Sequence, residues 1–381
     1  TLGSTNVLIA VLDNGVEWDH PDLKFSMAPT NVWRDAVDAD NDPRPSIGDY
    51  HGTSIAGIIA AGQSNSLGVT GVAPGCRVMP VRIAYGSSDE WIMETEWAVE
   101  GIGWAWQHGA SVLNISWAMG SPLTSVQDAL TAALTSGRSG KGCVVVAAAG
   151  NNNSRISGYP ASMPEVLTVG ASSPADERKS PDSVDGETFW GSSYNDPLDC
   201  VAPGVKIYTT DLSGSPGKSI DDYNGRFNGT SAAAPFAAAI AALVLSVDES
   251  LTQAEAVSIM TRSAERVGGY SYQELKTNGV WDVEMGYGRL NAHRAAAMAK
   301  GVDYDLPRLE HVPLPNQADT GPFVLNVDIS DSTGVDAGAN APRLYYRVVG
   351  ENWESITDTD GPDGGTFYFE IPFAPLGSTV E

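Results

Sequence analysis

Short apolar runs alternate with helical segments along the first 300 residues of this 381-residue chain, and no other feature constrains the fold as strongly. The first run, residues 7–12, is apolar at every position, which is typical of a strand buried on both faces. Such alternation predicts an α/β fold with a mainly parallel central sheet and helices on both faces. The further predicted strands are 77–83, 110–115, 143–148, 166–169 and 198–202.

Helices are predicted between these strands from their composition and their start signals. The segment 122–134 begins with proline and has Ser121 as its predicted N-cap. Alanine and other apolar residues dominate 231–247, which indicates a buried helix. Thr252 and Glu255 have the spacing of a capping box, which opens another helix. One more helix is predicted over residues 94–108.

The pattern changes near residue 300, where prolines are followed by runs that alternate apolar and polar residues. A period of two with intervening turns predicts antiparallel strands. We therefore predict two domains, an α/β domain over residues 1–300 and a β-rich C-terminal module over residues 301–381. The module resembles a truncated or incomplete immunoglobulin-like sandwich. Its predicted strands are 323–329, 342–349 and 366–371.

The net charge of −25, with only 22 lysines and arginines, argues against a nucleic-acid partner, because phosphate binding needs clustered cations. Two interpretations of the acidity stay open: carboxylates that bind Ca²⁺, and a surface adapted to saline or extracellular water. No uninterrupted apolar run reaches the ~18–20 residues that a membrane span needs. The chain does not start with a charged-then-apolar leader, so a leader was either cleaved or never present.

The cysteines do not define a redox compartment. Cys76, Cys143 and Cys200 form no CxxC pair and have no zinc-site spacing. One disulfide with a free thiol and three buried, inert thiols are both compatible with the sequence.

A candidate acid and a candidate base lie at the boundaries of predicted elements. Asp13 follows the buried strand 7–12, and ligand sites of open α/β sheets lie at such carboxyl ends. The alternative is an aspartate that caps its own turn. His51 begins a helix of small apolar residues, and histidine is suited to proton transfer near neutral pH. The alternative is a structural histidine.

A candidate nucleophile and a candidate amide donor have similar positions. Ser231 follows a Gly-Thr turn and opens an alanine-rich helix, so its hydroxyl and its N–H lie at the positive end of a helix. The alternative is an ordinary serine N-cap. Asn151 follows a buried strand that ends in Gly150, where an amide donor can face an oxyanion. The alternative is an asparagine-rich turn.

Together, these motifs are far more specific than each is alone. They resemble the signature motifs of subtilisin-like serine proteases, the subtilase family, in which the order Asp, His, Ser is that of subtilisin. The resemblance covers roughly residues 5–297, and it implies that the domain 1–300 is catalytic. The motifs that carry it are Asp13-Asn-Gly, His20-Pro-Asp-Leu23, His51-Gly-Thr, Ala149-Gly-Asn151 and Gly229-Thr-Ser231-Ala-x-x-Pro235.

The resemblance implies a serine endopeptidase in which Ser231 attacks the scissile carbonyl, His51 acts as general acid and base, and Asp13 orients the imidazole. Asn151 would stabilise the oxyanion. Protein or peptide substrates, an N-terminal propeptide and secretion are further implications. Two alternatives stay open: a peptide ligase or cyclase on the same scaffold, and a catalytically vestigial binding or adhesion protein.

The resemblance also implies which residues contact the substrate, which would add as an extended strand. Ala118 stands where the family usually has glycine, so its methyl group is expected to narrow the entrance. The segments expected beside the substrate are Ser116-Trp117-Ala118 and Ser87-Ser88-Asp89, and those expected in the primary specificity pocket are Ala148, Ala149 and Gly150.

A structural calcium site is implied in the same way. Ca²⁺ takes 6–8 oxygen ligands, which a loop of carbonyls with one carboxylate can supply. The alternative is a loop held only by its own hydrogen bonds. An acidic loop over residues 38–42 is either a second metal site or a solvated loop. The implied ligands are side-chain oxygens of Asp22 and Asn65 and carbonyls of Gly62, Leu67 and Val69.

Overall fold

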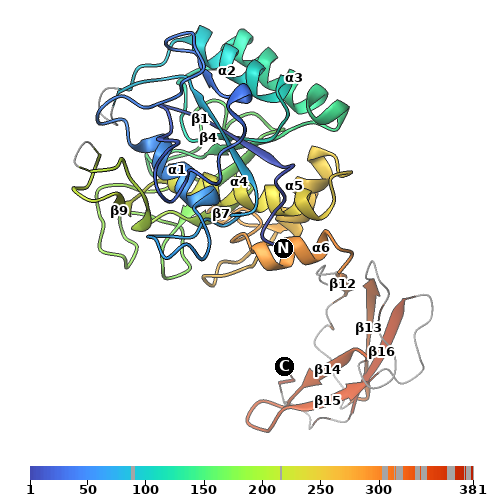
Figure 1. Ribbon diagram of the computed structural model, residues 1–381. Helices are drawn as coiled ribbons and strands as arrows, with labels where there is room; N and C mark the ends of the chain where they lie inside the picture. The colour runs from blue at the N-terminus through green and yellow to red at the C-terminus, as the bar shows by residue number, and fades with distance from the viewer. Residues whose placement is uncertain are drawn as a thin grey trace. The chain divides into compact units, whose positions relative to one another are not determined.

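A seven-stranded parallel sheet forms the centre of the N-terminal part of the computed structural model (Figure 1). Its strand order is β2-β3-β1-β4-β5-β6-β7. The strands are β1 Leu8–Asp13, β2 Arg34–Asp35, β3 Arg77–Arg82, β4 Ala110–Ile115, β5 Val144–Ala148, β6 Leu167–Ser172 and β7 Cys200–Pro203. The structure describes residues 1–86, 91–214, 217–302, 308–312, 314, 321–330, 335, 341–357, 365–372, 374 and 379–380.

The strand order places the carboxyl ends of four strands, β3, β1, β4 and β5, next to one another. Strand β1 is paired in parallel with β3 on one side and with β4 on the other, and β4 is paired in parallel with β5. The residues that follow these strands therefore meet at one edge of the sheet, which is where ligand sites of α/β sheets form. The predicted fold class is confirmed.

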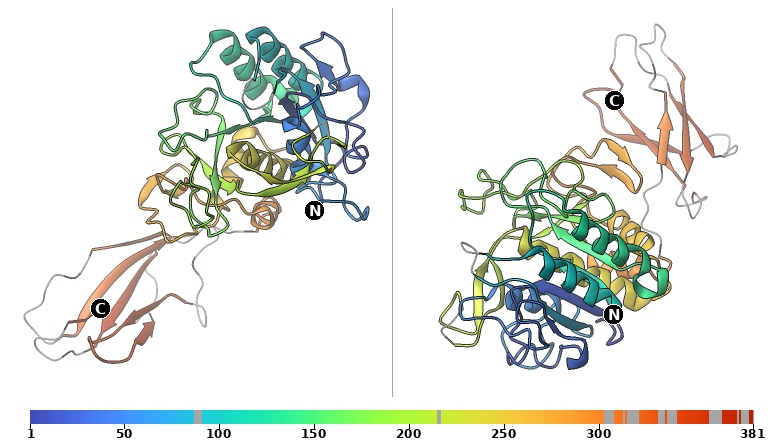
Figure 2. Two further views of the ribbon diagram at one scale, coloured as in Figure 1. Left: turned by 90° about the vertical axis from the view of Figure 1, so that its left-hand side faces the viewer. Right: turned by 90° about the horizontal axis from the view of Figure 1, so that it is seen from above.

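Strand β1 is buried on both faces of the sheet because its residues 8–12 are all apolar. Ile9 and Val11 belong to one core, whereas Ala10 and Leu12 belong to a second core on the opposite face. The helices α1 His51–Ala60 and α4 Thr230–Val247 contribute to the first core. The helices α2 Thr95–Gln107 and α3 Thr124–Gly140 lie side by side and contribute to the second (Figure 2).

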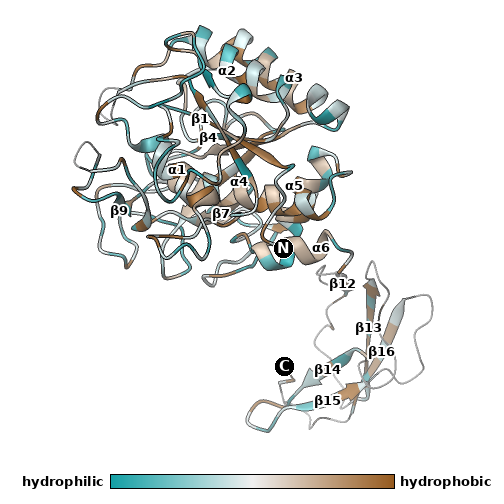
Figure 3. Ribbon diagram, viewed as in Figure 1, coloured by the Kyte–Doolittle hydropathy of each residue, from teal (hydrophilic) through white to brown (hydrophobic). Residues whose placement is uncertain are grey.

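Helix α4 is long and apolar enough to span a membrane by length and composition alone. It is largely buried, and it packs against α1 and against strands of the central sheet, which are themselves hydrophobic (Figure 3). These contacts identify α4 as the core helix of this unit. The sequence predicted a buried helix over residues 231–247, in agreement with α4. It did not show a candidate membrane span here, because Thr230, Ser231, Pro235 and Ser246 interrupt the apolar run.

Helix starts were predicted with mixed success. Helix α5, Gln253–Arg262, has the predicted capping box: Thr252 Oγ1 accepts the Glu255 N–H, and the Glu255 carboxylate accepts the Thr252 N–H. The predicted N-cap Ser121 is wrong, because α3 begins at Thr124 and its N-cap is Leu123. A capping box is a local feature, whereas a proline after a serine also fits an extended approach to a helix.

Several short elements were not predicted. The most important is an antiparallel hairpin formed by β8 Ile207–Thr210 and β9 Tyr223–Phe227. Mixed polar and apolar residues gave these strands no clear period. The others are the 3₁₀ helix Thr30–Val32, β2, β10 Glu274–Lys276, β11 Gly279–Trp281, α6 Ala292–Met298, β12 Arg308–His311 and β15 Glu354–Thr357.

The chain divides into two compact units, Thr1–Val302 and Asp303–Glu381. The second unit contains the predicted antiparallel strands, with a core formed by Val327, Ile329, Phe367 and Phe369. Its immunoglobulin-like character stays a prediction. The strands are β12 Arg308–His311, β13 Phe323–Ser330 and β16 Thr366–Ile371 in one sheet, and β14 Arg343–Tyr346 with β15 Glu354–Thr357 in another.

All three cysteines are buried and have free thiols, in agreement with the alternative of inert thiols. Burial raises the pKa of the Cys143 thiol to about 12, so this side chain stays protonated at neutral pH.

Candidate active site

The carboxylate at the end of β1 lies directly beneath the first turn of α1. Asp13 is fully buried. Gly52, the second residue of α1, is so close that a methyl group in its place would overlap the Gly15 carbonyl and press on the Asp13 side chain. The Asn14 Oδ1 accepts the Gly52 N–H at 3.0 Å. Because the N-cap residue Tyr50 makes no side-chain cap, Asn14 supplies it from another loop.

The imidazole of His51 is oriented by this carboxylate. His51 Nδ1 lies 2.9 Å from Asp13 Oδ1 and 3.0 Å from Asp13 Oδ2. The His51 side chain is 23% exposed, whereas that of Asp13 is 0% exposed. A buried carboxylate that accepts from Nδ1–H leaves Nε2 as the nitrogen that can take a proton. The sequence-predicted acid and base are therefore in contact.

The candidate nucleophile lies at the start of α4. The first turn of an α-helix has no intrahelical acceptors for its N–H groups, so the Ser231 N–H is available to an anion. The Ser231 Oγ donates to the Ser116 carbonyl at 3.1 Å, and the Ser116 hydroxyl donates to the Ser231 carbonyl at 3.2 Å. In this arrangement the described residues show no hydrogen bond between Ser231 and His51.

Ser231 and His51 line the same cavity, which has a volume of about 300 Å³. Ser116, Trp117 and Ala118 also line it, as the resemblance implied. Of the residues expected in the primary specificity pocket, Ala148 and Ala149 are buried at and just after the end of β5, and Gly150 follows them. These three do not belong to the lining of this cavity. The predicted residues Ser87, Ser88 and Asp89 lie outside the described residues.

The orientation of the Asn151 amide is fixed by Thr230. Both the Thr230 N–H and the Thr230 hydroxyl donate to Asn151 Oδ1, at 2.8 Å and 3.0 Å. The Thr230 Oγ1 in turn accepts the Gly150 N–H at 3.0 Å. Since Oδ1 is occupied by these donors, Nδ2 is the end of the amide that remains to donate. Asn151 is thus next to the nucleophile turn, with its Nδ2 group left to donate. It does not belong to the lining of the cavity, and its role as oxyanion donor stays a prediction.

Four other residues of the cavity were not predicted from the sequence: Asn14, Gly48, Tyr50 and Trp91. The first three adjoin Asp13 or His51 in the sequence, and that adjacency was an available signal. Trp91 had no such signal. Its ring lies 5.8 Å from the His51 ring at an interplanar angle of 74°, in an edge-to-face contact.

A second buried carboxylate lies near the cavity. Asp49 accepts the Gly86 N–H with both oxygens, at 3.0 Å and 3.1 Å, and so connects the residues before His51 to the end of the segment after β3. Burial raises the pKa of the Asp49 carboxyl, and the hydrogen bonds from Gly86 oppose this increase.

The residues of the implied calcium site lie together. Asp22 is buried, and its carboxylate accepts from Asn65 Nδ2 at 2.6 Å and from the Val69 N–H at 3.0 Å. Among the described residues, no donor bonds to the carbonyl oxygens of Gly62, Leu67 or Val69. The Asp22 carboxylate also accepts from the Tyr223 hydroxyl at 3.3 Å, and Asn65 Oδ1 accepts the Leu67 N–H at 3.0 Å. A buried carboxylate with loop carbonyls that accept no hydrogen bond is a donor set that suits Ca²⁺, which would replace these donors on Asp22 and Asn65. The part of the chain that the structure describes has no group of three or more His, Cys, Asp or Glu side chains that could hold a metal ion.

The acidic loop 38–42 is paired with an arginine side chain of the protein itself. The Arg82 guanidinium donates to Asp35 Oδ2 at 2.8 Å and to Asp38 Oδ2 at 2.6 Å. The Asp42 Oδ1 accepts from the Trp18 indole N–H at 2.9 Å. Two of the loop's acids are thus paired within the protein, which favours the interpretation as a structural loop over a second metal site.

Comparisons with known proteins agree with this geometry. Residues 4–288 match the Subtilase family of peptidases. The chain is 35% identical over 330 residues to a calcium-dependent protease of Nostoc sp., covering 77% of this chain and 46% of the relative. It is 34% identical over 280 residues to a subtilisin of Bacillus pumilus, covering 70% of this chain and 87% of the relative. It is 32% identical over 295 residues to a thermophilic serine proteinase of Bacillus sp. strain AK1, covering 77% of this chain and 63% of the relative.

An α/β fold in which an aspartate ends a strand, and a histidine and a serine begin neighbouring helices, is typical of serine hydrolases with a catalytic triad. Within that class, the chain belongs to the subtilase family. It spans about half the length of the calcium-dependent protease that it matches.

Proposed function

We propose that this protein is a serine endopeptidase that hydrolyses peptide bonds through an acyl-enzyme on Ser231. The observation that carries the proposal is the buried Asp13 carboxylate on His51 Nδ1, with the imidazole and the Ser231 hydroxyl facing one cavity. A serine hydroxyl is a weak nucleophile and needs such a base.

The reaction follows from the positions of these groups. When Ser231 Oγ leaves the Ser116 carbonyl and turns to His51 Nε2, the imidazole can take its proton as Oγ attacks the substrate carbonyl. The Ser231 N–H and the Asn151 amide would donate to the developing oxyanion. His51 then gives the proton to the leaving amine, and water repeats the sequence on the acyl-enzyme. Asp13 stabilises the imidazolium in both steps.

The same geometry bears on the two alternatives. A vestigial binding protein has no need for an oriented imidazole beside a helix N-terminus, and here Asp13, His51, Asn151 and Ser231 are all present. A ligase must exclude water from the acyl-enzyme, whereas the side chain of His51, the group that would activate this water, is 23% exposed. Both observations favour the hydrolase.

The test is labelling followed by product analysis. We expect a fluorophosphonate probe to label Ser231 and peptide libraries to yield hydrolysed fragments, identified by mass spectrometry. Joined or cyclised products would indicate a ligase, and failure of Ser231 to react would favour a binding protein. The sequences of the fragments would also define the side-chain preference, for which a broad, apolar or mixed preference is proposed.

We also propose that Asp22, Asn65, Gly62, Leu67 and Val69 hold a structural Ca²⁺. The Nostoc relative is named a calcium-dependent protease, which supports this proposal. The ion would offset the buried Asp22 charge and fix the loop after α1, so its contribution is to stability rather than to the reaction.

Calcium is expected to raise the melting temperature of the purified protein by roughly 10 °C relative to the chelated form, because a ligand at ~1,000 times its Kd contributes about 4 kcal/mol. Asp22→Asn should remove most of this calcium-dependent increment in a thermal melt. The matched control is Asp40→Asn in the acidic loop, which should retain the increment. Equal melting temperatures with calcium and with chelator would contradict the proposal, as would an increment lost only in Asp40→Asn.

Secretion to the extracellular medium and an N-terminal propeptide that inhibits the enzyme before maturation complete the proposal. Both follow from the resemblance to subtilases, and protein or peptide chains are the proposed partners.

A further inference from the structure

The helix that carries His51 is fixed to strand β8 by side-chain hydrogen bonds that the proposed chemistry does not use. The Thr209 hydroxyl donates to the Ser54 carbonyl at 2.7 Å, and the Thr210 hydroxyl donates to the Thr53 carbonyl at 2.7 Å. In return, the Ser54 hydroxyl donates to the Thr210 carbonyl at 2.8 Å. These side chains are fully buried, so water does not compete for the hydrogen bonds.

Helix α1 rests directly on these hydroxyl groups. Gly57 faces them, and a methyl group at this position would overlap both Thr209 Oγ1 and Thr210 Oγ1. The absence of a side chain therefore allows the helix backbone to reach the strand. Two threonines and one glycine thus set the distance between α1 and β8.

The same hairpin continues to the nucleophile. Strand β8 pairs with β9, which leads through Asn228 and Gly229 into Ser231. The Phe227 ring at the end of β9 lies 5.4 Å from the His51 ring in an edge-to-face contact. One hairpin therefore contacts the helix of the base and also ends at the turn of the nucleophile.

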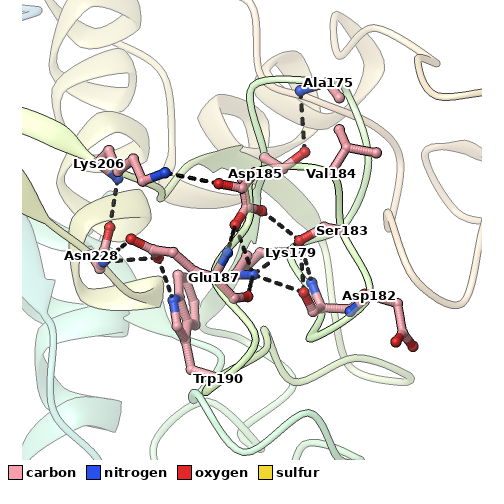
Figure 4. A network of polar contacts seen from close by, with 12 residues as sticks. Ala175, Lys179, Asp182, Ser183, Val184, Asp185, Glu187, Trp190, Lys206 and Asn228 are labelled. Carbon is pink, nitrogen blue, oxygen red and sulfur yellow. Dashed lines mark hydrogen bonds and ion pairs between the residues drawn. The ribbon is translucent and has the colours of Figure 1, made fainter.

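The nucleophile end of the hairpin is anchored by a separate polar network (Figure 4). The Asn228 amide donates to both Glu187 oxygens, at 3.0 Å and 3.1 Å, and its Oδ1 accepts the Lys206 N–H. The Lys206 ammonium donates to the Asp185 carbonyl at 2.8 Å. The fully buried Lys179 ammonium holds this loop together through Asp185 and Ser183. The hairpin is therefore held at the end that leads to Ser231.

We propose that Thr209 and Thr210 are positioning residues for His51: through the β8–β9 hairpin they hold the base in register with Ser231. The inference rests on the proposed function. If these hydroxyl groups are removed, the Thr53 and Ser54 carbonyls keep only the N–H donors of α1 itself, and two of the three side-chain hydrogen bonds between α1 and β8 are lost. Helix α1 can then move on β8 while the nucleophile turn stays anchored. A displacement of about 1 Å between reacting groups can cost about 10²-fold in rate.

The test compares Thr209→Val/Thr210→Val with Thr209→Ser/Thr210→Ser in the full chain. Valine keeps the shape and removes the hydroxyl, whereas serine keeps the hydroxyl. We expect kcat for a peptide substrate to fall at least tenfold in the valine variant, with KM within about twofold of wild type. Fluorophosphonate labelling should slow by a similar factor. The serine variant should restore kcat to within about threefold of wild type.

A matched control separates positioning from stability. Thr261 in α5 is also buried, and its hydroxyl donates to the Val257 carbonyl at 2.9 Å. Thr261→Val should lower the melting temperature while leaving kcat unchanged. If the double valine variant does not fold, Thr209→Val and Thr210→Val are measured singly, and each should lower kcat more than threefold. Valine variants that keep wild-type kcat would overturn the inference, as would serine variants as slow as the valine variants. An inactive, unlabelled wild type would instead overturn the proposed function.

Discussion

Replacing Ser231 by alanine is expected to lower kcat for peptide hydrolysis by about 10⁶, the magnitude known from subtilisin, because the attacking oxygen is lost. His51→Ala should cost about as much, since the hydroxyl is then left without a base. The double variant should be no slower than either single variant, because the two residues act as one unit. Any activity of these variants above the uncatalysed rate would come from Asn151, the helix N-terminus and substrate binding.

The measurement is kcat on a chromogenic peptide, with the concentration of each purified variant taken from its absorbance and its folding checked by a thermal melt. The matched control is Ser246→Ala at the other end of α4, whose hydroxyl donates to the Ala242 carbonyl at 2.6 Å. This variant should retain wild-type kcat. If the effects of Ser231→Ala and His51→Ala multiplied in the double variant, the two residues would be acting independently, which contradicts the proposed proton transfer between them.

Asp13→Asn is expected to lower kcat by about 10⁴, the second largest effect, with KM nearly unchanged. Both Asp13 oxygens lie within hydrogen-bonding distance of His51 Nδ1, so the carboxylate selects the tautomer with the proton on Nδ1. An asparagine can donate its amide N–H to Nδ1, which favours the proton on Nε2. In that tautomer the imidazole cannot accept the Ser231 proton.

The size of the loss in kcat for this variant separates two roles of Asp13, orienting His51 and capping its own turn. The Asn14 N–H also donates to Asp13 Oδ1 at 2.9 Å, which is the turn-capping role considered from the sequence. An asparagine keeps an oxygen for this turn, so a loss of less than tenfold in kcat would mean that Asp13 mainly caps its turn. A melting temperature close to that of the wild type would confirm that the variant is folded.

Much of the fold could be predicted from the sequence, because the signals for its main elements are local. Residues 7–12 are all apolar, which predicted a strand buried on both faces, and 110–115 was a further predicted strand; both segments correspond to strands in the structure, β1 and β4. The capping box at Thr252 was equally local. The hairpin β8–β9 could not be predicted in this way, because its buried threonines read as polar residues until their hydrogen-bond partners on α1 are known.

The candidate site divides in a similar way. Asp13, His51 and Ser231 each lie at an element boundary within a specific motif, so the sequence determined their identity and their types of chemistry. Trp91 on the imidazole and the Thr230 contacts that orient Asn151 depend on segments that are distant in the sequence. Only the tertiary structure could reveal these contacts.

The sequence by itself determined a parallel sheet, the elements that carry the reactive groups and the family to which they belong. The periodicity of apolar residues and the residue order within motifs extend over only a few residues, so they can be recognised in the sequence alone. The tertiary structure decided the distances between those groups: the contact of His51 with Asp13, the resting contact of Ser231 with Ser116, and the seating of α1 on β8. These distances depend on strand order and side-chain packing between segments far apart, which no local pattern encodes.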